Sequence, residues 1–294
     1  MDTLENLRGK IEGAKDLKSV VNAMKAMAGS NIIQYETAVS SLAAYYYTIA
    51  LGIVGYFKAE QIAAIEKPKG FKNKEEVICA IVFGSDQGLV GQFNDSMANF
   101  VSEYFKALTG KKEVWVVGER MQLLLSDEGF NTSKIYPVPN AINGVTPLIT
   151  EILNQSRKSQ DNENISVFYI FHNKPKPDSG YIPVMQRFLP LDQQWKDDLQ
   201  ETEWPTKLLP QLAGAVRPTL ATLIKGYLFT SLFKACVESL ASENASRLEA
   251  MQRAEKNISD QLEDLNKKYH RLRQSSIDEE LFDVVSGSEA LKKS

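Results

Sequence analysis

Cysteine and histidine are scarce in this sequence, and their scarcity narrows the chemistry that the chain can carry. The 294 residues include two cysteines, Cys79 and Cys236, and two histidines, His172 and His270. The cysteines are far apart and lie in no CxxC or Cys/His spacing, which argues against a zinc site and against a disulfide framework. Two histidines leave little material for imidazole catalysis or metal binding. We therefore predict no catalytic residue, no bound metal and no cofactor.

A large excess of charge is also missing. The formal net charge is −3, with 24% charged and 43% hydrophobic residues, which gives no electrostatic reason to bind nucleic acid or an anionic bilayer. The N-terminus lacks the basic segment of a signal peptide and the Arg/Ser-rich character of a transit peptide. Residues 37–57 carry no charge at all and are nearly long enough to cross a bilayer. Serines, glycines and four tyrosines in this segment favour a helix packed against protein instead.

Glycine and proline are absent from residues 227–286, and the rest of the chain is organised around this stretch. Its apolar residues recur every three or four positions: Val237, Ala241, Leu248, Met251, Ile258, Leu262, Leu265, Tyr269 and Leu272. The spacing predicts one continuous helix, about 90 Å long, with an apolar seam. Asn244 and Glu255 are polar residues at positions of this apolar seam, and such polar residues fix the register of a coiled coil. A helix of this length needs a partner helix along its seam.

The first segment of the chain supplies this partner. Residues 3–57 show the same apolar periodicity, from Leu4 to Ile53. Five glycines within it weaken the helix intrinsically, by up to about 1 kcal/mol each, so packing must hold it. A compact domain joins the near ends of the two helices. We therefore expect them to run antiparallel and to form one shaft, from residues 1–60 and 218–287.

The predicted register leaves the end of the last helix without a partner. Counting from the ends nearest the central domain puts Met24 opposite Arg247, so residues from about 271 to 286 extend beyond the start of the first helix. A single helix cannot bury the apolar side chains at this end by itself. We therefore predict that the overhang binds another protein through Leu281, Phe282, Val284 and Val285.

Between the two helices, the sequence alternates between strands and helices. Apolar runs predict strands at residues 77–83, 113–117, 134–138, 165–171 and 181–189, the last at an edge of the sheet. Helices are predicted at residues 94–108, 121–125 and 147–160, the third with Pro147 in its first turn. This alternation predicts an α/β fold, with a Rossmann-like parallel-sheet domain over residues 75–190. Prolines and amides predict an irregular connection over residues 191–217.

One glycine-rich turn lies where such a fold would bind a nucleotide phosphate. Residues 84–94 are GSDQGLVGQFN, between a predicted strand and a predicted helix. The glycines do not make GxGxxG, no GKS or GKT follows, and Glu119 is the sole candidate for a ribose-binding acid. The pattern therefore favours a structural turn. Asp86 with Glu119, and His172 with Lys174, are expected to be solvated loop groups rather than catalytic pairs.

Three motifs then occur in a characteristic order. NAMKAMAGS spans residues 22–30, SDQGLVGQFN spans residues 85–94, and the last helix carries ASENASRLEAMQRAEKN and LRQSSIDEELFDVVSGSEAL from residues 241 and 272. In sequence and spacing they resemble the KAMxMVAAS motif, the SDRGLCGxxN turn and the C-terminal helix of the gamma subunit of F-type ATP synthases. The resemblance covers nearly the whole chain, and the C-terminal motif is the most specific.

This resemblance implies a rotor rather than an enzyme. It implies a coiled-coil shaft inside a ring of alpha and beta subunits, with the α/β domain on the membrane c-ring beside the epsilon subunit. Ion flow would turn the ring, and the shaft would drive each beta subunit through its nucleotide-binding conformations. Without a transit peptide, the bacterial form is expected, as a peripheral membrane protein on the cytoplasmic face of the plasma membrane.

The resemblance also assigns contacts to particular residues. Arg273 and Gln274 match a pair that hydrogen-bonds a loop of the beta subunit. Met24, Glu243 and Arg247 match shaft positions that face the C-terminal domain of the beta subunit. These residues join Leu281, Phe282 and Val285 as the candidate partner-binding set.

Five positions depart from the family pattern. Asn22 and Asn31 replace lysines, Gln87 replaces an arginine, Val90 replaces a cysteine and Asp278 replaces a threonine. These departures indicate a divergent branch, such as the alternate sodium-type operons. The residues leave two other interpretations open: a coiled-coil scaffold or adaptor with a non-catalytic α/β domain, and a Rossmann-type nucleotide enzyme with helical arms.

Overall fold

The computed structural model describes residues 3–59, 77–162, 165–176, 180–200, 202, 204–208 and 216–292. The chain divides into two compact units. The first unit combines both ends of the chain, Met1–Ala28 and Leu248–Ser294, and the second unit is Gly29–Arg247. Two long helices contribute residues to both units, and each unit has its own packing.

The two long helices correspond to the two apolar seams of the sequence. Helix α1 (Leu4–Ala59) is capped by Thr3, whose Oγ1 accepts a hydrogen bond from the backbone N–H of Asn6 at 3.2 Å. Helix α6 (Val216–Lys292) starts slightly before and ends slightly after the predicted range. Pro218 lies in its first turn, where a backbone N–H has no helical partner to lose. The prediction of a long helix from each end of the chain is confirmed.

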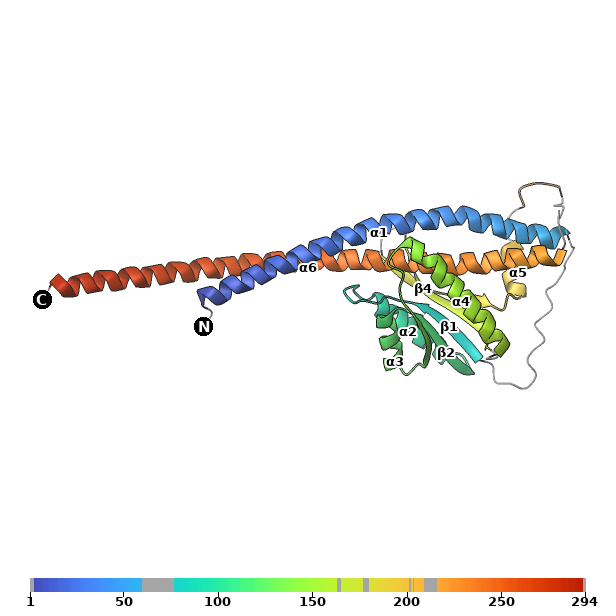
Figure 1. Cartoon of the computed structure of the whole chain (residues 1–294), viewed down its shortest axis with the longest axis horizontal. Helices are drawn as coiled ribbons and strands as arrows, with labels where there is room; N and C mark the ends of the chain where they lie inside the picture. The colour runs from blue at the N-terminus through green and yellow to red at the C-terminus, as the bar shows by residue number, and fades with distance from the viewer. Residues whose placement is uncertain are drawn as a thin grey trace. The chain divides into compact units, whose positions relative to one another are not determined.

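In the first unit, α1 and α6 form an antiparallel coiled coil (Figure 1). Its seam buries Val21, Met251 and Ile258, with Ala14, Met24, Ala250, Ala254 and Leu262 packed around them. Lys25 Nζ donates to Glu255 Oε2 at 2.5 Å, so the polar seam residue Glu255 is paired with the opposite helix. The pairing lies about two and a half turns from the predicted register, which put Met24 opposite Arg247. The long side chains of Lys25 and Glu255 can bridge positions that are not directly opposite, and in the second unit the bond of Asn31 to Asn244 lies about one turn from the same predicted register.

The second unit is built on a five-stranded sheet of order β3-β2-β1-β4-β5. Its strands are β1 (Val77–Phe83), β2 (Lys111–Val117), β3 (Thr132–Tyr136), β4 (Ile165–Pro175) and β5 (Tyr181–Leu189). The first four strands run parallel, whereas β5 pairs antiparallel with β4. The sheet is therefore mixed: its four parallel strands match the predicted parallel-sheet domain, and β5 lies at the edge as predicted but runs antiparallel. The short link from β4 to β5 can form a hairpin but not the crossover that a parallel strand needs.

Helices cover both faces of this sheet. Helices α2 (Phe93–Lys106) and α3 (Glu119–Asp127) pack on one face, and α4 (Ile142–Asn162), α1 and α6 pack on the other. Alternate residues of β1 point to opposite faces, as expected for a strand buried on both sides. Cys79 and Cys236 both lie in the core between the sheet and helices α4, α1 and α6. Burial raises the pKa of the Cys236 thiol. Both cysteines therefore act as core side chains.

Two of the shorter helices differ from the sequence prediction. Because α4 begins before the predicted start, Pro147 lies inside the helix instead of in its first turn. Buried neighbours such as Ile149 offset the hydrogen bond that Pro147 removes. Helix α5 (Gln193–Gln200) lies within the stretch expected to be irregular, residues 191–217. Asp192 starts it, since its Oδ1 accepts a hydrogen bond from the backbone N–H of Trp195 at 3.1 Å.

The end of the charge-free stretch of α1 packs within the second unit. Ile53 and Val54 are 0% and 1% exposed, in a cluster with Leu199 and Tyr227. Both α1 and Pro218–Ser286 are long and apolar enough to cross a membrane, but core helices of soluble proteins meet the same criterion. Of the apolar window of α1, 28% is buried within the structure, so its end packs against its own chain and most of the window stays exposed.

Candidate partner-binding site

The end of α6 presents large apolar side chains to solvent. Beyond Leu272, the side chains described up to residue 286 are exposed, apart from the half-exposed Ser276. The exposed fraction is 65% for Leu281, 72% for Phe282 and 49% for Val285. Apolar side chains of this size are usually buried, so a run of them along one helix marks a surface for a partner.

Charged groups surround these apolar side chains. An open groove of about 460 Å³ on α6 is lined by Ser275, Asp278, Glu279, Phe282 and Asp283. Arg273 and Gln274, which precede it, are exposed. The helix end thus offers basic, acidic and apolar groups in succession. A protein surface with complementary charges and an apolar centre could match this order.

Glu243 and Arg247, predicted to face a partner, are bonded to each other within the second unit. Arg247 Nη2 donates to Glu243 Oε1 at 2.6 Å, and their side chains are 15% and 7% exposed. Burial raises the pKa of Glu243 despite the charge of Arg247, and the charge of Asp86 adds to the effect. Met24 is half-buried in the seam of the first unit. Of these three predicted contact residues, Met24 and Arg247 keep partly exposed edges.

A polar stripe on α6, formed by Glu238, Ser242 and Ser246, closes the carboxyl edge of the sheet. These residues are four apart and share one helix face. They bond in order to the ring Nε2 of His172 at 2.8 Å, the carbonyl of Asn173 at 3.0 Å and the carbonyl of Val90 at 2.5 Å. Burial alone would raise the pKa of Glu238, but the hydrogen bond and charge of His172 hold it below its ordinary value. His172 is 4% exposed, so its prediction as a solvated loop group is wrong.

This stripe occupies the place where open α/β sheets bind nucleotides. The strand order reverses between β1 and β4, and ligands of such folds bind at the carboxyl ends of the strands at that reversal. Here α6 bonds to the turn after β1 and to the end of β4. In the described part of the chain, no group of three or more His, Cys, Asp or Glu side chains is placed to hold a metal ion.

The glycine-rich turn is held by its own hydrogen bonds. The carboxylate of Asp86 accepts hydrogen bonds from the backbone N–H groups of Glu119 and Val138, each at 3.0 Å. Asp86 therefore ties three loops together and is not the solvated group that we expected. Asn94 fixes the start of α2 by bonding to Ser85, with its Nδ2 donating to Oγ at 2.7 Å. The turn thus has a structural role, as its missing nucleotide motif indicated.

Sequence reasoning missed the polar stripe because it assigned polar side chains of the last helix to solvent or to a partner. The signal that could have revealed it is the run ACVESLASEN at residues 235–244, all of which are buried. Small side chains over three turns allow close approach on every side of a helix. A helix enclosed on all sides must bond its polar groups internally.

The geometry defines a class of protein. It is a coiled-coil stalk protein whose α/β domain is attached by its carboxyl edge to the stalk helix, instead of using that edge for a nucleotide. The exposed helix end marks it as a component of a larger assembly.

Comparison with known proteins narrows this class. A sequence model of the ATP synthase family matches residues 3–291. The ATP synthase gamma chain of Wolbachia sp. subsp. Brugia malayi is 26% identical over 99% of this chain and 100% of that protein. The gamma chain of Lachnoclostridium phytofermentans is 25% identical over the same shares. Among solved structures, a chain of the Euglena gracilis mitochondrial ATP synthase, from its OSCP/F1/c-ring part, has a TM-score of 0.63 at 17% identity, covering 98% of this chain and 94% of that one.

The chain belongs to the ATP synthase family and aligns with gamma chains from end to end. The structural likeness confirms the fold of long terminal helices around a central sheet.

Proposed function

We propose that the chain is the gamma subunit, the central-stalk rotor, of an F-type ATP synthase. It couples ion-driven rotation of the c-ring to ATP synthesis or hydrolysis in the ring of alpha and beta subunits, and it is not itself catalytic. The observation that carries this proposal is an exposed apolar helix end in a chain that matches gamma chains over its full length. Its partners are the alpha, beta and epsilon subunits and the c-ring. Through them it is peripheral to the membrane, on the cytoplasmic face of a bacterial plasma membrane.

A rotor must transmit torque without slippage between its parts. Polar pairs fix the helix register in both units: Lys25 with Glu255 in the first, and Asn31 with Asn244 at 3.3 Å in the second. The polar stripe fixes the α/β domain to α6. Rotation then presents different sides of the shaft to three otherwise equal beta subunits. Differences in contact energy shift each beta subunit among its conformations.

The contact residues divide into two groups under this proposal. Arg273 and Gln274 hydrogen-bond a beta-subunit loop, while Leu281, Phe282 and Val285 are buried in a sleeve of alpha and beta subunits. Met24 and Arg247 contact the beta subunits at their exposed edges. Because Glu243 is buried, it serves the contact by orienting Arg247.

Limited proteolysis tests this proposal. Trypsin should cut the chain alone after Arg271 and Arg273, because both side chains are exposed. After co-expression with alpha and beta subunits, both sites should be protected. Lys111, exposed at the start of β2, is an internal control whose cleavage should not change.

Two results would contradict the rotor. Equal cleavage after Arg271 with and without alpha and beta subunits would mean that these subunits do not cover the end of α6. A stable self-associated particle that does not co-purify with these subunits would support a coiled-coil scaffold instead.

A further inference from the structure

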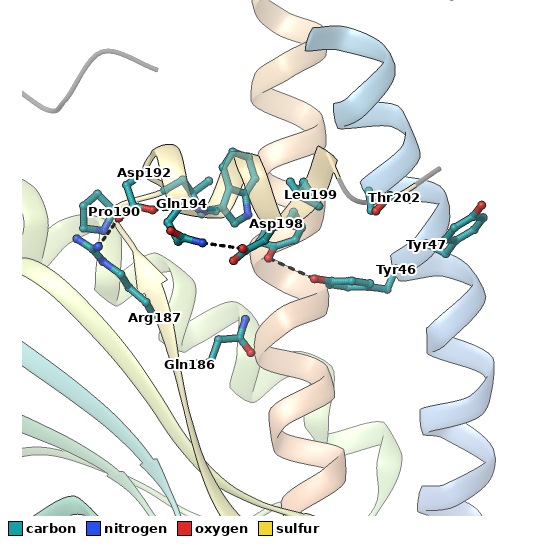
Figure 2. Close-up of a pocket in the computed structure, with 14 residues that line it drawn as sticks. Tyr46, Tyr47, Gln186, Arg187, Pro190, Asp192, Gln194, Asp198, Leu199 and Thr202 are labelled. Carbon is teal, nitrogen blue, oxygen red and sulfur yellow. Dashed lines mark hydrogen bonds and ion pairs between the residues drawn. The ribbon is translucent and has the colours of Figure 1, made fainter. Parts of the chain in front are cut away.

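Polar side chains around the pocket where α1, β5, α5 and α6 meet bond to one another (Figure 2). Arg187 pairs with Asp192, and Gln194 Nε2 donates to Asp198 Oδ1 at 2.9 Å. The first of these bonds attaches α5 to β5, and the second lies within α5, so both help to hold the second unit together. The lining gives no sign of a particular ligand, whereas the end of α6 carries a more specific pattern.

One face of α6 changes character towards the end of the helix. Residues at alternating steps of three and four share a helix face. On the face that contains Ile277, charged residues come first and apolar residues last, in the order Lys256, Asp260, Glu263, Lys267, His270, Gln274, Ile277, Leu281 and Val284. The exposed fraction is 50% for Ile277, 65% for Leu281 and 72% for Val284. The apolar stripe is thus confined to the end of α6.

Two exposed charges, Arg273 and Asp278, flank this stripe on opposite edges. Charged side chains on one helix pair at spacings of three or four, as Lys267 does with Glu263 at 2.6 Å. At these spacings from Arg273 and from Asp278, the sequence has no residue of opposite charge. The two are five positions apart, too far around the helix to pair with each other. Their charges are therefore placed for a neighbouring helix rather than for their own.

A parallel two-stranded coiled coil matches this arrangement. In such a coil, each residue at positions a and d of the heptad faces its own counterpart, and position g of one helix meets position e of the next heptad on the other. The stripe fits these positions: Gln274 and Leu281 at a, Ile277 and Val284 at d, Arg273 at g and Asp278 at e. Two copies of this helix would stack isoleucine on isoleucine, leucine on leucine and valine on valine. They would also pair arginine with aspartate on both edges.

We propose that two unassembled chains pair in parallel and in register through residues 270–286 of α6. The sequence selects a second copy as the occupant, because the apolar residues meet their equals while Arg273 meets Asp278. An antiparallel pair would place Leu281 against the polar His270 instead. All residues of this interface belong to the first unit. The pairing precedes assembly and does not rest on the proposed function. Alpha and beta subunits that cover the same face would separate the two copies.

Cysteine crosslinking of the full chain tests the pairing and its direction. Ile277→Cys places a thiol where two copies would meet, so mild oxidation should give a disulfide-linked dimer. Glu279→Cys is the matched control, because position 279 is exposed on the opposite side of the same helix. It should give little dimer, since a disulfide needs Cα atoms within about 7 Å. The native Cys79 and Cys236 are 0% and 1% exposed and should not interfere.

A charge exchange tests the recognition. Arg273→Asp turns two attractive pairs of the dimer into repulsive ones, and it should raise the dimer dissociation constant about tenfold, as expected for exposed ion pairs. Arg273→Asp combined with Asp278→Arg restores opposite charges and should return the constant to within about threefold of the wild-type value. Analytical ultracentrifugation of the full chain measures each constant. Cleavage after Arg273 should slow as the concentration of the chain rises, so the proteolysis of the chain alone is done at high dilution.

Co-expression with alpha and beta subunits separates the pairing from the proposed function. Three results would overturn the pairing alone: a wild-type chain that co-purifies with these subunits but is monomeric by itself at every concentration, equal disulfide yields at positions 277 and 279, or a double variant that dimerises no better than Arg273→Asp. A dimer that forms as described but never co-purifies with alpha and beta subunits would support the pairing and contradict the rotor.

Discussion

Two carboxylates on adjacent turns of α6 show how strongly the local partner decides the state of a buried residue. Both Glu238 and Glu243 are about 5% exposed, so burial opposes the charged form of each. For Glu238, the hydrogen bond and charge of His172, with nearby lysines, outweigh burial and lower the pKa. For Glu243, burial outweighs Arg247 and raises the pKa. The two residues therefore affect stability in different pH ranges and with opposite sign.

Glu243→Gln should reduce the pH dependence of stability above pH 4.5. The folded-state pKa of Glu243 lies above its ordinary value of 4.5, so the folded chain holds this proton more tightly than the unfolded chain. The unfolding free energy then falls as the pH rises from 4.5 through the raised pKa. Glutamine at position 243 does not titrate, so the variant should not show this fall of the unfolding free energy with pH. Urea unfolding of the full chain at several pH values, followed by circular dichroism, measures the difference.

Glu238→Gln is the matched comparison. The folded-state pKa of Glu238 is lowered, so its stabilising contribution is present above pH 4.5 and is lost as the pH falls below that value. This variant should be less stable than the wild type at neutral pH. Equal slopes for the wild type and Glu243→Gln above pH 4.5 would contradict the assignment of Glu243.

At the scale of elements, packing rather than intrinsic propensity holds α1. A Cβ atom added at Gly13 or Gly29 would meet no other atom within 4 Å. Neither glycine serves a close contact between helices, and both only weaken the helix. At the turn after β1 the situation is reversed, because a Cβ at Gly84 would lie 2.3 Å from the Cβ of Met121.

Gly13→Ala should therefore stabilise the chain, whereas Gly84→Ala should destabilise it. Alanine at position 13 removes a helix penalty of up to about 1 kcal/mol without a clash. Alanine at position 84 forces the turn after β1 away from α3, at a cost of about 1–3 kcal/mol for overpacking. Thermal unfolding by circular dichroism should show a higher Tm for the first variant and a lower Tm for the second. A lower Tm for Gly13→Ala would reveal a helix contact at that position.

The elements that were predicted well are those determined by residues close together in the sequence. The apolar runs of β1 and β5 have the predicted bounds, because a continuous hydrophobic segment between turns is visible in the sequence. The antiparallel direction of β5 follows from a short link that periodicity does not record. The burial of Glu243 depends on α6 being enclosed, for example by a bond between Ser246 and Val90, which are 156 positions apart. No local pattern specifies so distant a contact.

At the scale of the whole molecule, burial is divided unevenly between the two units. The second unit has a sheet covered on both faces, with separate cores on each side. Among its described residues, the first unit buries six apolar side chains, Leu7, Ile11, Val21, Ala28, Met251 and Ile258, and the exposed end of α6 contributes none of them. The second unit should therefore keep its fold without partners. The end of α6 needs a partner to bury its apolar side chains.

Truncation after Tyr269 should separate the folding of the second unit from the binding of partners by the end of α6. It removes the exposed apolar and charged groups of the overhang but none of the residues in the buried seam cluster. We expect weaker co-purification with alpha and beta subunits and an unchanged fluorescence of Trp115, which is 0% exposed in the sheet. Glu280→Ala, a change at one exposed position of the same helix, is the control and should assemble normally. Unchanged co-purification of the truncated chain would mean that the overhang is not the partner surface. A changed Trp115 signal would mean that the overhang supports the sheet, so the two results point to different errors.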